Sequence, residues 1–160
     1  MTKSKEVHFE EEVFDVLTSD SDWIAGTAAD LDLDVGLRLD DTFGFIAETQ
    51  PDEWAKFAGT QPSEAAARTE FTKRLVSEIN QRGTVDVLRH GIKGWGRRFK
   101  LCSFRPAHGL TPELSVAYDA NRAVVTRQQR YTSANTNTLV LCLFLNGPPG
   151  ATLELKNPLT

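Results

Sequence analysis

Thr138-Leu-Val-Leu-Cys-Leu-Phe-Leu145, followed by Asn146-Gly-Pro-Pro-Gly150 and then by residues 151–156, is the stretch that decides the fold. An apolar run, a turn sequence and a second extended run together predict a β-hairpin. Its second strand ends in Glu154-Leu-Lys156. Because strand side chains alternate between faces, we expect Glu154 and Lys156 to point the same way.

This pair has the chemistry of phosphodiester hydrolysis. A carboxylate can hold Mg²⁺, while a lysine can orient or deprotonate the attacking water and offset charge on the phosphate. The same Glu-x-Lys spacing also occurs on solvated strand faces, so the spacing alone leaves both interpretations open.

Several stretches along the chain, including parts of the hairpin, are best interpreted together. They are His8-Phe-Glu-Glu-Glu-Val-Phe-Asp-Val-Leu17, Trp54-Ala-Lys56, Arg82-Gly-Thr-Val-Asp-Val-Leu-Arg-His-Gly91, Phe104-Arg-Pro-Ala-His-Gly-Leu110, Val125-Thr-Arg-Gln-Gln-Arg-Tyr131, Asn146-Gly147 and Glu154-Leu-Lys-Asn-Pro158. Together they resemble the N-terminal region of type I restriction enzyme R subunits, and the resemblance runs almost from end to end.

The resemblance implies an α/β fold with a restriction-endonuclease-like core, a central mixed sheet flanked by helices. It implies a PD-(D/E)xK nuclease that cleaves foreign duplex DNA with Mg²⁺, in the cytoplasm, alongside methyltransferase and specificity subunits. Carried over by position, Glu154 would hold the metal, Lys156 would serve the water, and Glu12 on a first helix would be a further metal ligand.

Two departures from the family pattern bear on activity. The family requires an aspartate six residues before the Asn-Gly turn and fourteen before the glutamate, and both counts lead to Val140. Valine cannot ligate a metal, and residues 132–153 contain no acid that could replace it. In the family, further helices and an ATP-driven motor follow, so residues 1–160 are expected to form one incomplete nuclease-like domain, with ATP used only in the missing motor.

We therefore expect this chain to be inactive as a nuclease because Val140 stands at the aspartate position. Two alternatives remain: a non-catalytic remnant that binds DNA, and a truncated product that folds poorly.

The charge is unevenly distributed. Residues 1–60 contain 4 Lys and Arg against 15 Asp and Glu, whereas residues 61–130 contain 13 against 6. A basic region favours a phosphate-bearing partner. The candidate DNA contacts are Arg97 and Arg98, in a glycine-rich stretch interpreted as a flexible loop, and Arg127, Gln128 and Arg130, before the hairpin. The alternatives are a solvated loop and, for Arg127, an ion pair with an acid of the first sixty residues.

Helical patterns occur at four places. Residues 7–17 carry an apolar stripe of Phe9, Val13, Val16 and Leu17, with a metal ligand or a solvated acidic face as the two interpretations of Glu12. Turn and capping residues predict helices over about 51–59 and 62–83, and from residue 111. We also expect a strand over 98–104, and either a strand or an extended loop over 31–40.

Other sequence features indicate a cytoplasmic protein. No run approaches the roughly 18 apolar residues of a membrane span, and the first residues lack the apolar segment of a signal peptide. Cys102 and Cys142 stand singly in apolar stretches, which predicts buried, reduced thiols.

Overall fold

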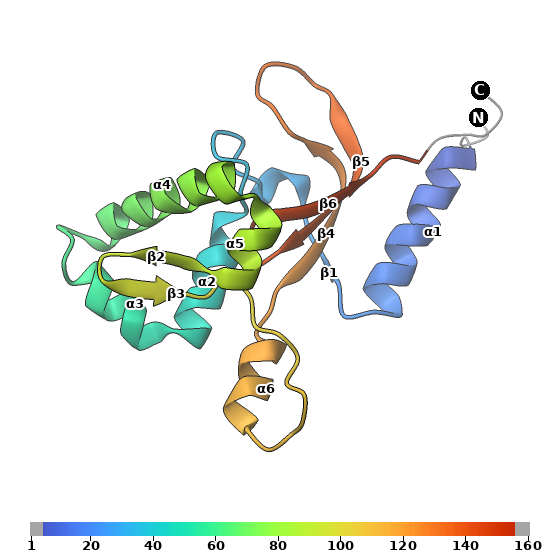
Figure 1. Ribbon diagram of the computed structural model, residues 1–160. Helices are drawn as coiled ribbons and strands as arrows, with labels where there is room; N and C mark the ends of the chain where they lie inside the picture. The colour runs from blue at the N-terminus through green and yellow to red at the C-terminus, as the bar shows by residue number, and fades with distance from the viewer. Residues whose placement is uncertain (1–4, 156–160) are drawn as a thin grey trace. The chain divides into compact units, whose positions relative to one another are not determined.

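The computed structural model describes residues 5–155, which form two compact units (Figure 1). Of the described residues, unit 1 contains 5–39 and 122–155, and unit 2 contains 40–121. The middle of the chain, with most of its basic residues, thus forms a unit separate from that of the hairpin.

A mixed four-stranded sheet forms the centre of unit 1. Its order is β1-β4-β5-β6, with β1 parallel to β4 and the other neighbours antiparallel. The strands are β1 (Ile24–Ala25), β4 (Ala123–Arg130), β5 (Thr138–Leu145) and β6 (Pro149–Leu153). The predicted α/β class, with a mixed sheet and flanking helices, is confirmed.

The β5–β6 hairpin follows the expected pattern closely. β5 has the predicted bounds, and β6 ends at Leu153, so Glu154 lies one residue beyond it. Asn146 and Gly147 take φ angles of 51° and 105°, a region that Asn and Gly tolerate better than other residues. The buried Asn146 side chain also accepts a hydrogen bond from the backbone N of Arg122 at 2.7 Å. The turn is therefore attached to the beginning of β4.

Helix α1 (Lys5–Ser19) contains the predicted helix over 7–17. Its buried face differs from the predicted apolar stripe, because Phe9 and Val16 are 52% and 49% exposed whereas Glu10 is 4% exposed. The predicted stripe was wrong at Phe9 and Val16. Glu10 pairs with Arg127 of β4, and this polar contact decides which face of α1 turns towards the sheet.

The segment 31–40 is a turn rather than a strand. The backbone N of Asp34 donates to the Asp32 side chain at 2.9 Å, and an isolated bridge joins Asp32 to Leu37. Arg38 of this segment is buried. It donates to the carbonyl of Thr27 at 2.9 Å, and this hydrogen bond holds the loop before the short helix η1 (Ala28–Asp30).

Unit 2 contains the helices that lie, in the sequence, between the two segments of unit 1. The helices predicted over 51–59, over 62–83 and from residue 111 are confirmed, whereas two further helices were not predicted. The Ser63 side chain caps the longest helix by accepting from the backbone N of Ala66 at 3.1 Å. The elements are α2 (Leu39–Thr49), α3 (Pro51–Ala58), α4 (Glu64–Arg82), α5 (Thr84–His90) and α6 (Pro112–Asp119).

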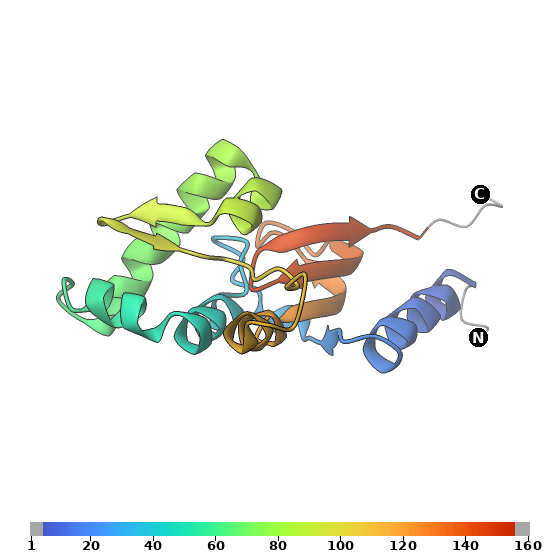
Figure 2. The same cartoon turned by 60° about the horizontal axis from the view of Figure 1, so that its bottom comes forward.

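A short hairpin replaces the flexible loop that we expected around Arg97 and Arg98. It consists of β2 (Ile92–Gly94) and β3 (Arg97–Phe99), joined by Trp95 and Gly96. Both turn residues have positive φ, as two-residue hairpin turns of the primed types require. Figure 2 shows the hairpin alongside α4.

Six aromatic rings in contact with one another form part of the core of unit 2. The shortest centroid distance, 4.2 Å, joins Phe57 to Trp95, so the turn residue of the hairpin belongs to this cluster. Phe57 and Phe71 are fully buried, and Trp54 is half-buried. The six rings are those of Phe43, Trp54, Phe57, Phe71, Trp95 and Phe99.

Both cysteines are free thiols. Cys142 is buried and Cys102 is half-buried, and burial raises the pKa of Cys142 to about 11, which keeps its thiol protonated near neutral pH. Within residues 5–155, no helix combines the length and apolar composition required to cross a bilayer.

We predict that Gly91→Ala strongly destabilises unit 2. Gly91 has φ 66° and ψ −168°, and a Cβ there would lie 2.2 Å from the carbonyl oxygen of Phe99. Gly83 is a matched control, because its φ of 84° and ψ of 154° are similarly strained for alanine but nothing lies within 4 Å. In urea unfolding, Gly91→Ala should lower the free energy of unfolding by about 1–3 kcal/mol more than Gly83→Ala does. Equal losses would contradict the close approach.

Candidate functional site

The paired residues of the hairpin end one residue short of Glu154. β5 pairs Leu141 with Leu153 and Cys142 with Thr152, and one further step of the same register would set Val140 opposite Glu154. Side chains at opposed positions of antiparallel strands lie about 5 Å apart, close enough for two carboxylates to share a metal ion. Two acids at positions 140 and 154 would make such a site, but residue 140 of this chain is valine.

The described residues do not complete a metal site here. Glu154 is an exposed carboxylate, and the apolar side chain of Val140 has no ligating atom. Lys156 lies outside the described residues. Within residues 5–155, no three His, Cys, Asp or Glu side chains are grouped so that they could hold a metal ion. The donors present at this position therefore do not fit Mg²⁺.

Glu10, rather than Glu12, is the acid of α1 that faces the sheet. Its carboxylate accepts from Nε of Arg127 at 2.8 Å and from Nε2 of Gln128 at 2.9 Å. Glu12 is exposed on the same helix. Of the alternatives considered for Arg127, the structure contains the ion pair with an N-terminal acid, and Glu11 adds a second carboxylate at 3.8 Å.

Arg127 and Gln128 reach the same carboxylate because β4 is irregular. Successive strand side chains normally point to opposite faces, but Gln128 has φ 48°, which interrupts the alternation. For the same reason Thr126 can donate to the side chain of Gln129, three residues away, at 2.9 Å. The hydroxyl of Thr138 donates to Gln128 at 2.8 Å, so one amide connects α1, β4 and the beginning of β5.

The remaining candidate DNA contacts, Arg97, Arg98 and Arg130, differ in whether a carboxylate neutralises their charge. Arg97 forms an ion pair with Glu53 at 3.0 Å. Arg98 donates twice to the carbonyl of His90, at 3.1 and 2.7 Å, and Arg130 donates to the carbonyl of Asn135 at 2.9 Å. Carbonyl partners orient a guanidinium without neutralising it. Arg98 and Arg130 are exposed, so both can still meet a phosphate.

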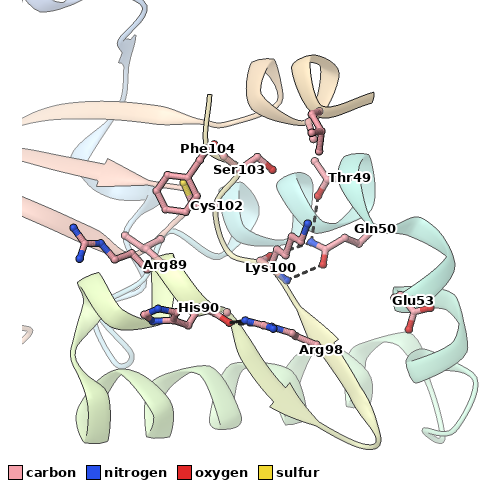
Figure 3. Close-up of a pocket in the computed structure, with 14 residues that line it drawn as sticks. Thr49, Gln50, Glu53, Arg89, His90, Arg98, Lys100, Cys102, Ser103 and Phe104 are labelled. Carbon is pink, nitrogen blue, oxygen red and sulfur yellow. Dashed lines mark hydrogen bonds between the residues drawn. The ribbon is translucent and has the colours of Figure 1, made fainter. Parts of the chain in front are cut away.

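A cavity of about 650 Å³ in unit 2 was not foreseen from the sequence (Figure 3). Its wall comes from the ends of α2 and α5, from β3 and the segment after it, and from α6. The only sequence signal was the basic character of residues 89–100, since the apolar part of the wall lies in helices and loops far apart in the chain. The polar side chains lining it include Gln50, Glu53, Arg89, His90, Arg98 and Lys100.

We predict that Glu10→Ala lowers the free energy of unfolding by about 2–3 kcal/mol, because it leaves Arg127 and Gln128 without their shared acceptor. Glu12→Ala, on the same helix but exposed, should change stability by less than about 0.5 kcal/mol. Denaturant unfolding of both variants checks this. If the two variants lose the same stability, the Glu10 contact does not hold α1 to the sheet.

Comparison with known proteins gave no match: no protein-family model, no curated protein and no solved structure is significantly similar to this chain.

Proposed function

We propose that this chain is the nuclease-like N-terminal region of a type I restriction enzyme R subunit, with a restriction-endonuclease-like fold and a disabled hydrolytic centre. The observation that carries the proposal is the β5–β6 hairpin, because its register, extended by one residue past the Leu141–Leu153 pair, would set Val140 opposite Glu154, where two acids could share a metal. The family role is Mg²⁺-dependent cleavage of foreign duplex DNA in a restriction-modification system. The partners would be methyltransferase and specificity subunits, with ATP used by the family's motor.

The mixed sheet supports this proposal. Its hairpin ends in a glutamate next to a buried apolar strand. The resemblance gave Glu12 of the first helix as a further metal ligand, but Glu12 is exposed and another acid of α1 faces β4. The acid concerned is Glu10, and its carboxylate is already bound by Arg127 and Gln128. Glu10 therefore acts as a packing residue in this chain, and Glu154 is the acid proposed for the metal position.

The loss of one acid removes the main charge that would retain a divalent cation. Mg²⁺ requires oxygen ligands in a nearly octahedral arrangement and keeps its waters when protein carboxylates are few. One exposed glutamate opposite a valine does not meet this requirement. We therefore propose that the chain has no hydrolytic activity of its own.

Restoring the acid tests this proposal. We expect no Mg²⁺-dependent nicking of supercoiled plasmid by the natural chain. Val140→Asp should bind Mn²⁺ at least about tenfold more tightly in calorimetry, because it adds a second carboxylate opposite Glu154. Val140→Asn is the matched control, since it has the same shape as the aspartate without its charge.

Two results would contradict the proposal. Nicking by the natural chain that disappears in Glu154→Ala would show an active centre. Equal Mn²⁺ binding by the Asp and Asn variants would show that residues 140 and 154 do not form a metal position. Binding is measured separately from cleavage, so the result does not depend on recovery of activity.

A second candidate function is binding of duplex DNA without cleavage. It is favoured by Arg98 and Arg130, two exposed guanidinium groups that donate to backbone carbonyls, at 2.7 and 2.9 Å. Such groups bind phosphate irrespective of sequence, and the binding weakens as salt rises because counterions are released.

For this candidate, we predict that Arg130→Ala weakens duplex binding and lowers the slope of log affinity against log salt by about 1. Arg68→Ala is the control, because Arg68 is also exposed but is paired with Glu64 at 3.3 Å. Fluorescence anisotropy over a salt titration measures both slopes. Binding that does not respond to salt, or equal effects of the two variants, would exclude this candidate.

A further inference from the structure

The cavity of unit 2 is lined by both cationic and apolar side chains. Arg98 and Lys100 extend from β3 and from the residue that follows it, while Leu88, Leu114 and Phe104 supply apolar surface. At about 650 Å³, its volume lies within the roughly 300–1,000 Å³ typical of small-molecule sites. A site of this kind suits a ligand that has an anionic end and a flat apolar end.

The cations that line the cavity are not neutralised from within it. Among the described residues, Glu53 is the one acid in the lining, and its carboxylate already binds Arg97 at 3.0 Å and Lys56 at 3.1 Å. These contacts hold the pKa of Glu53 below its ordinary value. Figure 3 shows Glu53 on the opposite side of the view from Arg89 and Phe104. An anion entering the cavity therefore meets uncompensated positive charge.

The wall is also rigid before any ligand binds. Gln50 exchanges two hydrogen bonds with the backbone of Lys100, at 2.9 and 2.8 Å. Asn121 does the same for Ser103, at 3.1 and 2.6 Å. Two side-chain amides thus replace a neighbouring strand along residues 100–103. Arg98 is held as well, since its Nε and Nη2 both donate to the carbonyl of His90.

Phe104 is the only Phe, Tyr or Trp among the residues that line the cavity in the described part of the chain, and it is 61% exposed. An exposed ring next to cations is how proteins stack a nucleobase while they hold its phosphate. Burial raises the pKa of Cys102, which also lines the cavity, so this thiol stays protonated and contributes wall surface instead of a nucleophile.

From this arrangement we infer that the cavity binds a single nucleotide unit, with the phosphate on Arg98 and Lys100 and the base against Phe104. The nucleotide can be a free nucleoside monophosphate or the phosphorylated end of a DNA strand, which share this chemistry. The cavity belongs to unit 2 and the β5–β6 hairpin to unit 1, so this inference does not depend on the proposed nuclease relationship.

Calorimetric titration of the intact chain with thymidine 5′-monophosphate tests the inference. Lys100→Ala should weaken binding about tenfold, because it removes one charged contact to the phosphate. The variant keeps the fold, since Gln50 contacts only the backbone of Lys100. Lys73→Ala, an exposed lysine on α4 that does not line the cavity, should leave affinity unchanged.

The base contact is tested by Phe104→Leu, which retains apolar surface but loses the flat ring. It should weaken binding of the nucleotide severalfold and leave binding of inorganic phosphate unchanged. Tyr118→Leu is the control, because Tyr118 is an exposed aromatic on α6 outside the cavity lining. A 5′-phosphorylated oligothymidine that binds more tightly than the free nucleotide would identify a strand end, and equal binding would identify a free nucleotide.

Three results would overturn the inference. One is the absence of nucleotide binding. Another is equal affinity for inorganic phosphate and for the nucleotide, with no effect of Phe104→Leu. The third is an equal loss in Lys100→Ala and Lys73→Ala. None of these results bears on Mn²⁺ binding by Val140→Asp, so failure here is distinguishable from failure of the proposed nuclease relationship.

Discussion

Unit 1 depends on the pairing of β5 along both of its edges. With β4 on one side and β6 on the other, the backbone groups of this apolar strand find partners, and its side chains supply much of the buried core of the unit. An ionised aspartate in such a strand is unfavourable unless a metal or a hydrogen-bond donor compensates its charge. Valine at position 140 removes that requirement. Valine at position 140 therefore favours a strand that is stable without a bound cation.

The polar contacts of unit 1 centre on the irregularity of β4. Because Gln128 has a positive φ, its side chain and that of Arg127 both donate to the carboxylate of Glu10. The side chain of Gln128 also accepts a hydrogen bond from Thr138. Backbone strain of this kind persists only where surrounding contacts compensate for it. Here three hydrogen bonds compensate, and they occupy Arg127 and Gln128, two of the predicted DNA contacts. In this chain these side chains hold α1 to the sheet.

The hairpin and four helices could be predicted because local signals decide them. An apolar run before Asn146-Gly147 and capping residues such as Ser63 act within a few residues. The choice between Glu10 and Glu12 could not be predicted, because it depends on Arg127, 117 positions away in the chain. The β2–β3 hairpin was missed because its glycines resemble a loop, while the residue that stabilises it, Trp95, packs against Phe57 of a distant helix.

The distribution of charge explains why the two units suit different roles. In unit 1 the basic side chain nearest to α1 is bound by carboxylates, so its charge is used for folding. In unit 2 the pairing of Glu53 with Arg97 and Lys56 occupies the acid of the cavity and leaves Arg98 and Lys100 uncompensated. Electrostatic attraction for phosphate is strongest where cations are held in place and their charge is not already balanced. This condition is met in the cavity, and it is met there whether or not the hairpin of unit 1 can hold a metal.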